Sequence, residues 1–351
     1  MKVEDLDTPF LIVDLDGLEQ NLARAEDYCE RHGIGLRPHI KTHKCINIAR
    51  MQMERGAIGI AAQKLGEAEV MADGGVAQDI LIPYNIVGQK KLERLTALAR
   101  RTRVTVAADS DYTVQGLSEA CSKAGVTVGV AIEVWQGRTG VKDATKAVEL
   151  AQLADRSAGT EIRGIMIMPS PPSARPLIRE FLEKFDEHGI PYPIVSGGAS
   201  PYLWTAHEIP ELTEHRAGEY PVGGLRHLRS GTHTVEQCAV RVLMTVVSRP
   251  ADEVAILDGG TKSLSAENFH DEEGNLMGHI IEYPQARFHG ASEEHGHVDV
   301  SACNPRPRIG EKVQVIPVHP CPTFNEHNEL AAVSDNEVET IWPIHARGMI
   351  R

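Results

Sequence analysis

Eight short β-rich runs alternate with helical patterns along the first two thirds of the chain. The candidate strands are 34–40, 57–62, 79–83, 103–108, 126–134, 161–168, 192–197 and 214–220. Between them, apolar residues recur at three- and four-residue spacing in the candidate helices 65–73, 90–101, 145–156 and 177–188. Both a barrel and an open doubly wound sheet would show this periodicity. Eight units of roughly 25–30 residues favour an α/β fold of the (β/α)8 TIM-type barrel kind.

The pattern changes after about Gly231. Strand-like runs at 237–248, 253–257, 312–318 and 338–343 follow one another, joined by turns rich in Gly, Pro, Asn and Asp. No segment there predicts a convincing helix. We therefore predict a barrel over residues 21–230 and a C-terminal all-β domain over 231–351. Residues 1–20 contain an early strand, Phe10–Asp14, which we expect to join the β domain.

Composition and charge narrow the class of protein. The chain has 351 residues, of which 42% are hydrophobic and 24% charged, as is ordinary for a soluble globular protein. Its formal net charge of −13 argues against nucleic acid and against anionic membrane surfaces as partners. The acidic start MKVEDLDTPF predicts no export signal, and six scattered cysteines without a CxxC pair are typical of a reduced protein. We expect a cytoplasmic location.

A basic motif ends the first predicted barrel strand. It reads Arg-Pro-His-Ile-Lys-Thr-His-Lys over residues 37–44. Side chains alternate along a strand, so His39 and Lys41 should point the same way, into the barrel mouth where such enzymes keep their chemistry. A lysine shielded from water near other cations has a lowered pKa and becomes a competent amine nucleophile. A basic strand end that binds nothing is the alternative interpretation.

A second motif lies near the C-terminus. His319 and Cys321 are one residue apart in a predicted strand, so both side chains should leave the same face, between the stiffening Pro320 and Pro322. An imidazole and a thiolate suit Zn²⁺ better than Mg²⁺ or Ca²⁺, and two protein ligands leave positions open for water and substrate. For an isolated HxC pair, a buried cysteine beside an unrelated histidine is the more common situation.

The sequence is similar to a known family over nearly its whole length. The motifs are RPHIKTHK, DTPFLIVDLDGLEQN, KLGEAEVMADGG, GRTGV, VSGGAS, HRAGEY, EEHG, HPCPTFN and WPIHARG, in family order. They resemble the D-threonine aldolase and D-serine dehydratase family, alanine racemase-like enzymes of fold type III that use pyridoxal 5′-phosphate (PLP). The resemblance implies PLP on Lys41, with His39 and His43 as further catalytic candidates, and Arg138 facing the cofactor ring. The acid and base roles among His39, His43 and His295 stay open.

The same resemblance implies a divalent metal on His319 and Cys321, with Zn²⁺ or Mn²⁺ expected and Mg²⁺ as a further candidate. Family members are homodimers in which the β domain of one subunit faces the barrel of the other, so we expect a homodimer. In barrels the phosphate site usually follows strands seven and eight. We therefore assign Ser196, Gly197, Gly198 and Ser200 to the PLP phosphate and Tyr220 to the cofactor rim. Two glycine-containing turns without a ligand are the alternative.

PLP together with a Lewis acid points to small β-hydroxy amino acids as substrates, because cleavage beside a β-hydroxyl requires handling that oxygen. The D-configuration comes from the family alone. Retro-aldol cleavage to glycine and an aldehyde is favoured by WPIHARG and KLGEAEVM. Elimination to a 2-oxo acid and ammonia is favoured by Cys321 in place of Asp. A racemase and a non-catalytic PLP carrier are weaker alternatives, since neither uses the metal pair.

Two segments depart from the family pattern, 166–173 after the sixth strand and 223–229 after the eighth. In the second, Arg226 and Arg229 could bind an acidic group of the substrate. This hypothesis requires that neutralising both arginines change KM for an acidic substrate. Surface arginines are the alternative.

Overall fold

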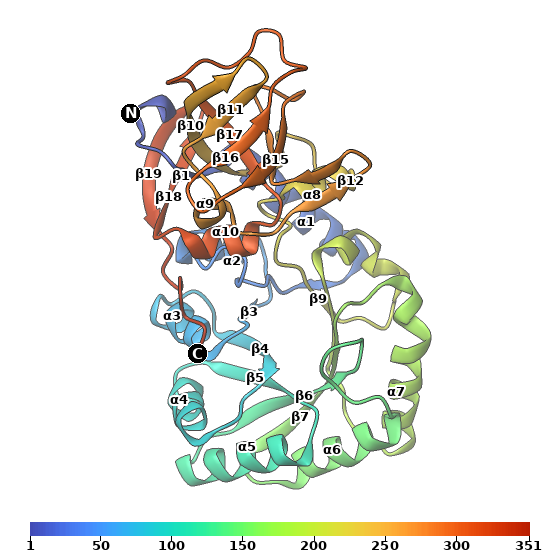
Figure 1. The fold of residues 1–351 in the computed structure, drawn as a ribbon. Helices are drawn as coiled ribbons and strands as arrows, with labels where there is room; N and C mark the ends of the chain where they lie inside the picture. The colour runs from blue at the N-terminus through green and yellow to red at the C-terminus, as the bar shows by residue number, and fades with distance from the viewer. The chain divides into compact units, whose positions relative to one another are not determined.

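The computed structural model describes residues 1–351 and divides the chain into two compact units (Figure 1). Unit 1 comprises Met1–Arg24, Thr42–Cys45 and Glu219–Gly348, and unit 2 comprises Ala25–Lys41, Ile46–Gly218 and Met349–Arg351. The chain therefore passes from one unit to the other five times. None of its helices has both the length and the apolar character needed to cross a bilayer.

Unit 2 contains the predicted parallel barrel. Its eight strands are β2 (Gly35–Leu36), β3 (Ile60–Ala61), β4 (Asp79–Asn85), β5 (Arg103–Ala108), β6 (Val128–Val134), β7 (Thr160–Ile167), β8 (Ile194–Gly198) and β9 (Glu214–Arg216), in the order β2-β9-β8-β7-β6-β5-β4-β3. A parallel bridge between His39 and Ala61 closes the ring, and the Ile40 amide donates to the Ala61 carbonyl at 2.9 Å. The predicted fold class, a (β/α)8 TIM-type barrel with a C-terminal mostly-β domain, is confirmed.

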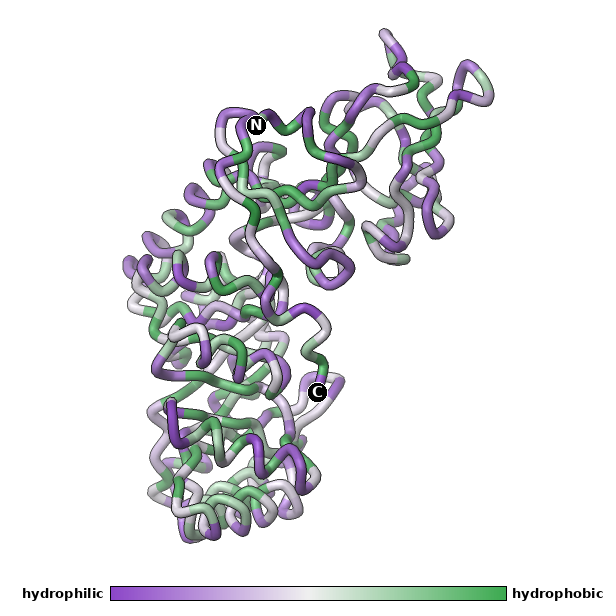
Figure 2. Tube along the Cα trace, turned by 90° about the vertical axis from the view of Figure 1, so that its left-hand side faces the viewer, coloured by the Kyte–Doolittle hydropathy of each residue, from purple (hydrophilic) through white to green (hydrophobic).

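The helices of unit 2 follow the strands in the expected alternation. They are α2 (Ile46–Glu54), α3 (Leu65–Asp73), α4 (Gln89–Ala99), α5 (Asp111–Ala124), α6 (Ala144–Arg156) and α7 (Arg175–Glu187), with the 3-10 segments η2 (Pro172–Ala174) and η3 (Ser200–Glu208). Hydrophobic and hydrophilic residues mix along the helical turns of the chain in Figure 2. Helices α4 to α7 lie outside the strands in Figure 1. Their buried positions, such as Leu117, Ala147 and Phe181, cover the barrel strands as an amphipathic pattern requires.

Unit 1 is built on a nine-stranded sheet. The strands are β1 (Phe10–Asp14), β10 (Val240–Ala251), β11 (Val254–Leu257), β14 (Gly278–Ile280), β15 (Arg287–Ala291), β16 (Gly296–Asp299), β17 (Lys312–Pro317), β18 (Glu329–Ser334) and β19 (Glu337–Pro343). A separate hairpin pairs β12 (Phe269–Asp271) with β13 (Gly274–Leu276). Strand β1 lies antiparallel to β10 and parallel to β18, and its inner residues are fully buried.

Two short helices lie after Gly231, where the sequence predicted none: α9 (Thr261–Leu264) and α10 (Pro320–Glu326). Helix α8 (Leu225–Arg229) lies just before that point, and the 3-10 turn η1 (Val3–Asp5) lies near the N-terminus. Helix α1 (Leu15–His32) begins in unit 1 and ends in unit 2. The C-terminal part of unit 1 begins at Glu219. The domain limits predicted from the sequence are 1–20, 21–230 and 231–351, so the predicted boundary lies twelve residues later. Those limits remain a prediction about independently folding domains.

Candidate cofactor site and metal centre

The predicted cofactor lysine lies at the carboxyl end of the first barrel strand. Lys41 is partly buried and follows His39, which is 5% exposed and forms the bridge that closes the ring. Nε2 of His39 lies 3.0 Å from Oε1 of Gln63, and its Nδ1 is buried without a hydrogen-bond partner. Burial, together with the charges of Lys41 and Arg216, holds the pKa of His39 well below its usual value. The imidazole is therefore neutral at physiological pH.

Arg138 lies beside a buried carboxylate at the end of β6. Its Nη2 is 4.0 Å from Oε1 of Glu133 and 3.4 Å from Sδ of Met168. The turn that carries it needs Gly140, because φ is +113° there and a Cβ would meet the Glu133 carbonyl oxygen at 2.7 Å. Burial raises the pKa of Glu133. A hydrogen bond with Thr139 and the charges of Arg138 and Arg216 lower this pKa, but by less than burial raises it.

Arg216, which the sequence analysis did not assign, is a buried cation at the end of β9. Its Nε donates to Oγ of Ser196 at 2.8 Å, and its Nη2 donates to the Ile167 carbonyl at 3.0 Å. The Ser196 hydroxyl in turn donates to Oε1 of Glu214 at 2.7 Å. Burial lowers the pKa of Arg216 to about 10. Alternation along the predicted strand, which puts Glu214 and Arg216 on one side, was the signal that could have found it.

The predicted phosphate residues follow one another at the end of β8. A Cβ on Gly198 would lie 3.3 Å from both terminal nitrogens of Arg216, and one on Gly197 would lie 2.8 Å from Oγ of Ser170. Glycine thus permits the close backbone approach there. Oγ of Ser200 accepts from the Gly218 amide at 3.1 Å, which joins the ends of β8 and β9.

The carboxyl end of the barrel is therefore rich in cations. The charges of Lys41 and Arg216 both act on His39, and Arg138 and Arg216 both act on Glu133. A buried cation, Arg216, together with Lys41, Arg138 and a glycine turn, fits an anionic ligand such as PLP, and the unpaired Nδ1 of His39 can accept a hydrogen bond from a ligand.

Two further predicted site residues belong to unit 1: Tyr220, predicted at the cofactor rim, and His43, predicted as a catalytic candidate. Tyr220 is buried, and its carbonyl accepts from Nε2 of His233 at 3.0 Å. His43 is also buried, and its Nδ1 accepts from the Cys45 amide at 3.2 Å. Both assignments remain predictions.

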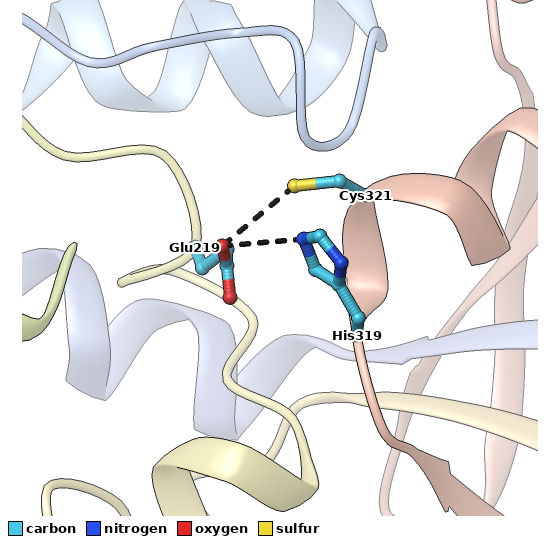
Figure 3. Close-up of side chains that lie close together, drawn as sticks. All are labelled: Glu219, His319 and Cys321. Carbon is cyan, nitrogen blue, oxygen red and sulfur yellow. Dashed lines mark hydrogen bonds and ion pairs between the residues drawn. The ribbon is translucent and has the colours of Figure 1, made fainter. Parts of the chain in front are cut away.

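His319 and Cys321 meet a third side chain, Glu219, within unit 1 (Figure 3). The three potential ligand atoms all lie within 4.8 Å of one another. Oε1 of Glu219 is 3.5 Å from Nε2 of His319 and 3.8 Å from Sγ of Cys321. Carboxylate, imidazole and thiolate are the donors that bind Zn²⁺, and three of them leave a fourth position open, as in catalytic zinc sites.

The backbone at this cluster is not the predicted strand. His319 is the N-cap of helix α10, with extended φ and ψ of −138° and 110°, and Cys321 lies in the first turn of that helix. Proline explains the difference, because a fixed φ and a missing N–H suit the first turn of a helix, where amides have no partner anyway. The two side chains still converge, by a helix start rather than by strand alternation.

His319 lies between two acidic side chains, Glu219 and Cys321. Burial lowers the pKa of His319, but hydrogen bonds and charges from Cys321 and Glu219 outweigh it and raise the pKa to about 11. The imidazole is thus held as a cation between two acids. A divalent metal could take the place of that proton, so the residues fit the metal that the sequence predicted.

Further side chains support the cluster. Both carboxylate oxygens of Glu267 lie close to Nδ1 of His319, at 2.9 and 3.0 Å. Oγ1 of Thr42 is 3.1 Å from Sγ of Cys321. Sequence analysis missed Glu219 and Glu267, because neither lies at a spacing from His319 that is typical of metal ligands. For Glu219, the one sequence signal was an acidic residue directly after the predicted glycine turn.

Comparison with known proteins places the chain in a family. Residues 13–225 match the family model of the alanine racemase N-terminal domain, and residues 239–333 match that of a putative serine dehydratase domain. D-threonine aldolase of Arthrobacter sp. is 33% identical, over 99% of this chain and 94% of that protein. The chain belongs to the alanine racemase-like, fold-type III family of PLP-dependent enzymes that act on D-β-hydroxy amino acids.

Two solved structures illustrate the range of this family. The crystal structure of D-threonine aldolase from Filomicrobium marinum is 30% identical, with a TM-score of 0.92 over 100% of this chain and 98% of that one. A cysteine-to-alanine mutant of D-threo-3-hydroxyaspartate dehydratase in a metal-free form is 26% identical, with a TM-score of 0.88 over 98% of both chains. Both aldolases and dehydratases are thus relatives, and the aldolases are slightly closer.

Proposed function

We propose that this protein is a PLP- and metal-dependent lyase that cleaves D-β-hydroxy amino acids by the retro-aldol reaction, giving glycine and an aldehyde. The observation that carries the proposal is the cluster of Glu219, His319 and Cys321, which a racemase of the same fold would not need. When bound, PLP supplies an electron sink for Cα, and the metal supplies a Lewis acid for the β-hydroxyl.

In the barrel, Lys41 would hold the cofactor, and Gly197, Gly198, Ser196 and Ser200 would hold its phosphate. Arg138 would face the ring, paired with the buried Glu133. Burial keeps His39 neutral with Nδ1 open, so this nitrogen can accept a proton from the substrate hydroxyl. His43 and Tyr220 stay candidates for the same pocket.

At the cluster, His319 and Cys321 would hold the metal with Glu219 as a third ligand. A soft thiolate and an imidazole favour Zn²⁺, whereas the added carboxylate also suits Mn²⁺ and Mg²⁺. The sequence supports joining the two sites in one reaction. Lys41 is followed directly by Thr42, whose hydroxyl lies against Cys321, and Gly218 is followed directly by Glu219.

Elimination to a 2-oxo acid and ammonia is the second candidate. One observation favours it: a cysteine at position 321, since a relative whose cysteine-to-alanine mutant was solved in a metal-free form is a D-threo-3-hydroxyaspartate dehydratase. In that reaction Lys41 would remove the α-proton, and the β-hydroxyl would leave. The aldolase is preferred because, among relatives matched over nearly the whole chain, those with identities of 33% and 30% are aldolases.

Product identification separates the two candidates. Purified protein with PLP and either Zn²⁺ or Mn²⁺ would be incubated with D-threonine, D-serine and D-3-hydroxyaspartate, and the products identified by mass spectrometry. Glycine plus an aldehyde is expected. A 2-oxo acid plus ammonia would establish the dehydratase instead, and racemised substrate alone would contradict both.

Cofactor attachment needs its own measurement. Borohydride reduction followed by peptide mass spectrometry should place the cofactor on Lys41. Lys44 is the matched control residue, because it lies in the same basic motif but its Nζ donates to Oδ1 of Asn325 at 3.0 Å. Attachment to Lys44, or to no lysine, would contradict the cofactor assignment.

A further inference from the structure

Helix α8 contributes two adjacent residues, Arg226 and His227, to the surroundings of the Glu219–His319–Cys321 cluster. We propose that both are positioning residues of the metal centre, one for His319 through Glu267 and the other for Glu219. The inference rests on the proposed metal site and deepens it. It concerns the segment 223–229, which departs from the family pattern, and it gives Arg226 a different role from the acidic-substrate contact suggested by the sequence.

The first chain of contacts runs from Arg226 to His319. Nη2 of Arg226 donates to Oε2 of Glu267 at 2.7 Å. Glu267 accepts from Nδ1 of His319 through either carboxylate oxygen. A carboxylate that accepts from Nδ1 fixes the ring orientation and leaves Nε2 for a metal. Nε2 is the nitrogen that lies near Glu219.

The role of Arg226 in this series of contacts is to hold the Glu267 carboxylate in place. Glu267 is 41% exposed, and an exposed glutamate samples several rotamers unless a partner holds it. The guanidinium restrains the carboxylate in the place where it meets His319, as charge-assisted hydrogen bonds do. Arg226 therefore acts on the metal ligand through Glu267, without touching it.

The second contact runs from His227 to Glu219. His227 is 5% exposed, and neither of its ring nitrogens has a hydrogen-bond partner, although Nδ1 lies 3.7 Å from Oε2 of Glu219. The other carboxylate oxygen, Oε1, is the one that faces His319 and Cys321. A buried nitrogen that is otherwise unpaired gains a bond when Oε2 moves a few tenths of an ångström towards it. His227 would then hold Glu219 with Oε1 turned to the metal.

The surroundings fix His227 and its helix. The ring of His233 packs edge-on against that of His227, with 5.0 Å between centroids, and His233 is itself held by the Tyr220 carbonyl. The N-cap of helix α8 is Gly224, where φ is +155° and a Cβ would lie 2.9 Å from Cδ of Pro320. This glycine allows the start of α8 to approach the start of α10, which carries His319 and Cys321.

Metal affinity tests the proposal without reliance on activity. Apoprotein would be titrated with Co²⁺ and Zn²⁺ against a competing chelator, and the thiolate-to-cobalt absorption would report the geometry at Cys321. Arg226→Gln, Glu267→Gln and His227→Phe should each weaken binding by about 10–100-fold and change the cobalt spectrum. Because Arg226 acts through Glu267, the double variant Arg226→Gln/Glu267→Gln should be no weaker than Glu267→Gln alone.

Controls separate positioning from folding. Arg287→Gln removes an arginine of the same unit that pairs with Asp271 and has no link to His319, so it should leave metal affinity unchanged. Glu267→Asp should restore part of the affinity, and the thermal stability of the apoproteins should stay close to wild type. Unchanged metal affinity in Arg226→Gln and His227→Phe would overturn the proposal. A wild-type protein without thiolate-to-cobalt absorption would overturn the metal site itself, and with it this inference.

Discussion

At the scale of single residues, burial decides most of the chemistry. His39, His215 and His233 are buried histidines with lowered pKa values, so they stay neutral near pH 7. His319 is the opposite case, because two acids hold it protonated. Three of these four histidines lie in motifs that the sequence analysis identified. Their protonation states depend on burial in the folded protein, and the spacing of residues in the sequence does not reveal burial.

Acid should destabilise the barrel through His215. Burial lowers its pKa to about 4, from 6.5 when unfolded. Between these values the unfolded chain binds more protons, so the stability present above pH 6.5 is lost as the pH falls towards 4. The loss at pH 5 is about 2 kcal/mol from this residue. His215→Gln should flatten the fall in urea midpoint between pH 7 and pH 5. His188→Gln, on an exposed histidine, should leave the slope as it is; equal slopes for the wild type and His215→Gln would contradict the assignment.

Replacing the thiolate should change metal preference. Cys321→Asp keeps a negative ligand but replaces soft sulfur with hard oxygen, so Zn²⁺ affinity should fall relative to Mn²⁺ affinity by about an order of magnitude. Competition between the two metals on the same protein measures that ratio directly, and any general loss of affinity cancels in it. A ratio equal to that of the wild type would show that Cys321 is not a ligand.

At the scale of elements, the barrel could be predicted, but helix α10, which carries Cys321, could not. Strand Arg103–Ala108 and helix Leu65–Asp73 match their predicted bounds, because each has one periodicity and clear end signals. His319 and Cys321 were predicted to lie in a strand, because the short run around them shows no period; Cys321 instead lies in helix α10. The convergence of Glu219 on His319, 100 positions away in the sequence, depends on tertiary packing and has no local signal at all.

Strand β7 depends on one glycine. The register between β6 and β7 shifts after Val130, and Gly164 follows this bulge with φ of +127°. A Cβ there would lie 2.0 Å from the Ile194 carbonyl oxygen, in the backbone of β8. Gly164→Ala should therefore cost about 3 kcal/mol or more in unfolding free energy. Gly189→Ala also has a positive φ, of +62°, but open space around it, and should cost only about 1 kcal/mol. Equal costs in denaturant melts would contradict this account.

At the scale of the whole molecule, the family predicts a homodimer. A chain of 38.4 kDa should then elute with twice that mass in size-exclusion chromatography with light scattering. The net charge of −13 limits non-specific association, so a larger mass at moderate salt would indicate specific contact. A mass of one chain, unchanged on concentration, would contradict the prediction.

The position of β1 has a consequence for biosynthesis. This strand precedes both of its partners in the sequence, Val240–Leu243 of β10 and Ala331–Val333 of β18. Translation at about 5–20 residues per second makes the β10 residues roughly 10–50 s and the β18 residues roughly 15–60 s after β1. Until β10 is made, an apolar segment with unpaired backbone groups has no strand of its own sheet to join, and one of its edges stays unpaired until β18 is made. The nascent chain should therefore depend on holding chaperones, and rapid overexpression should fill inclusion bodies with chains whose barrel helices have formed but whose first strand has paired with a neighbouring molecule.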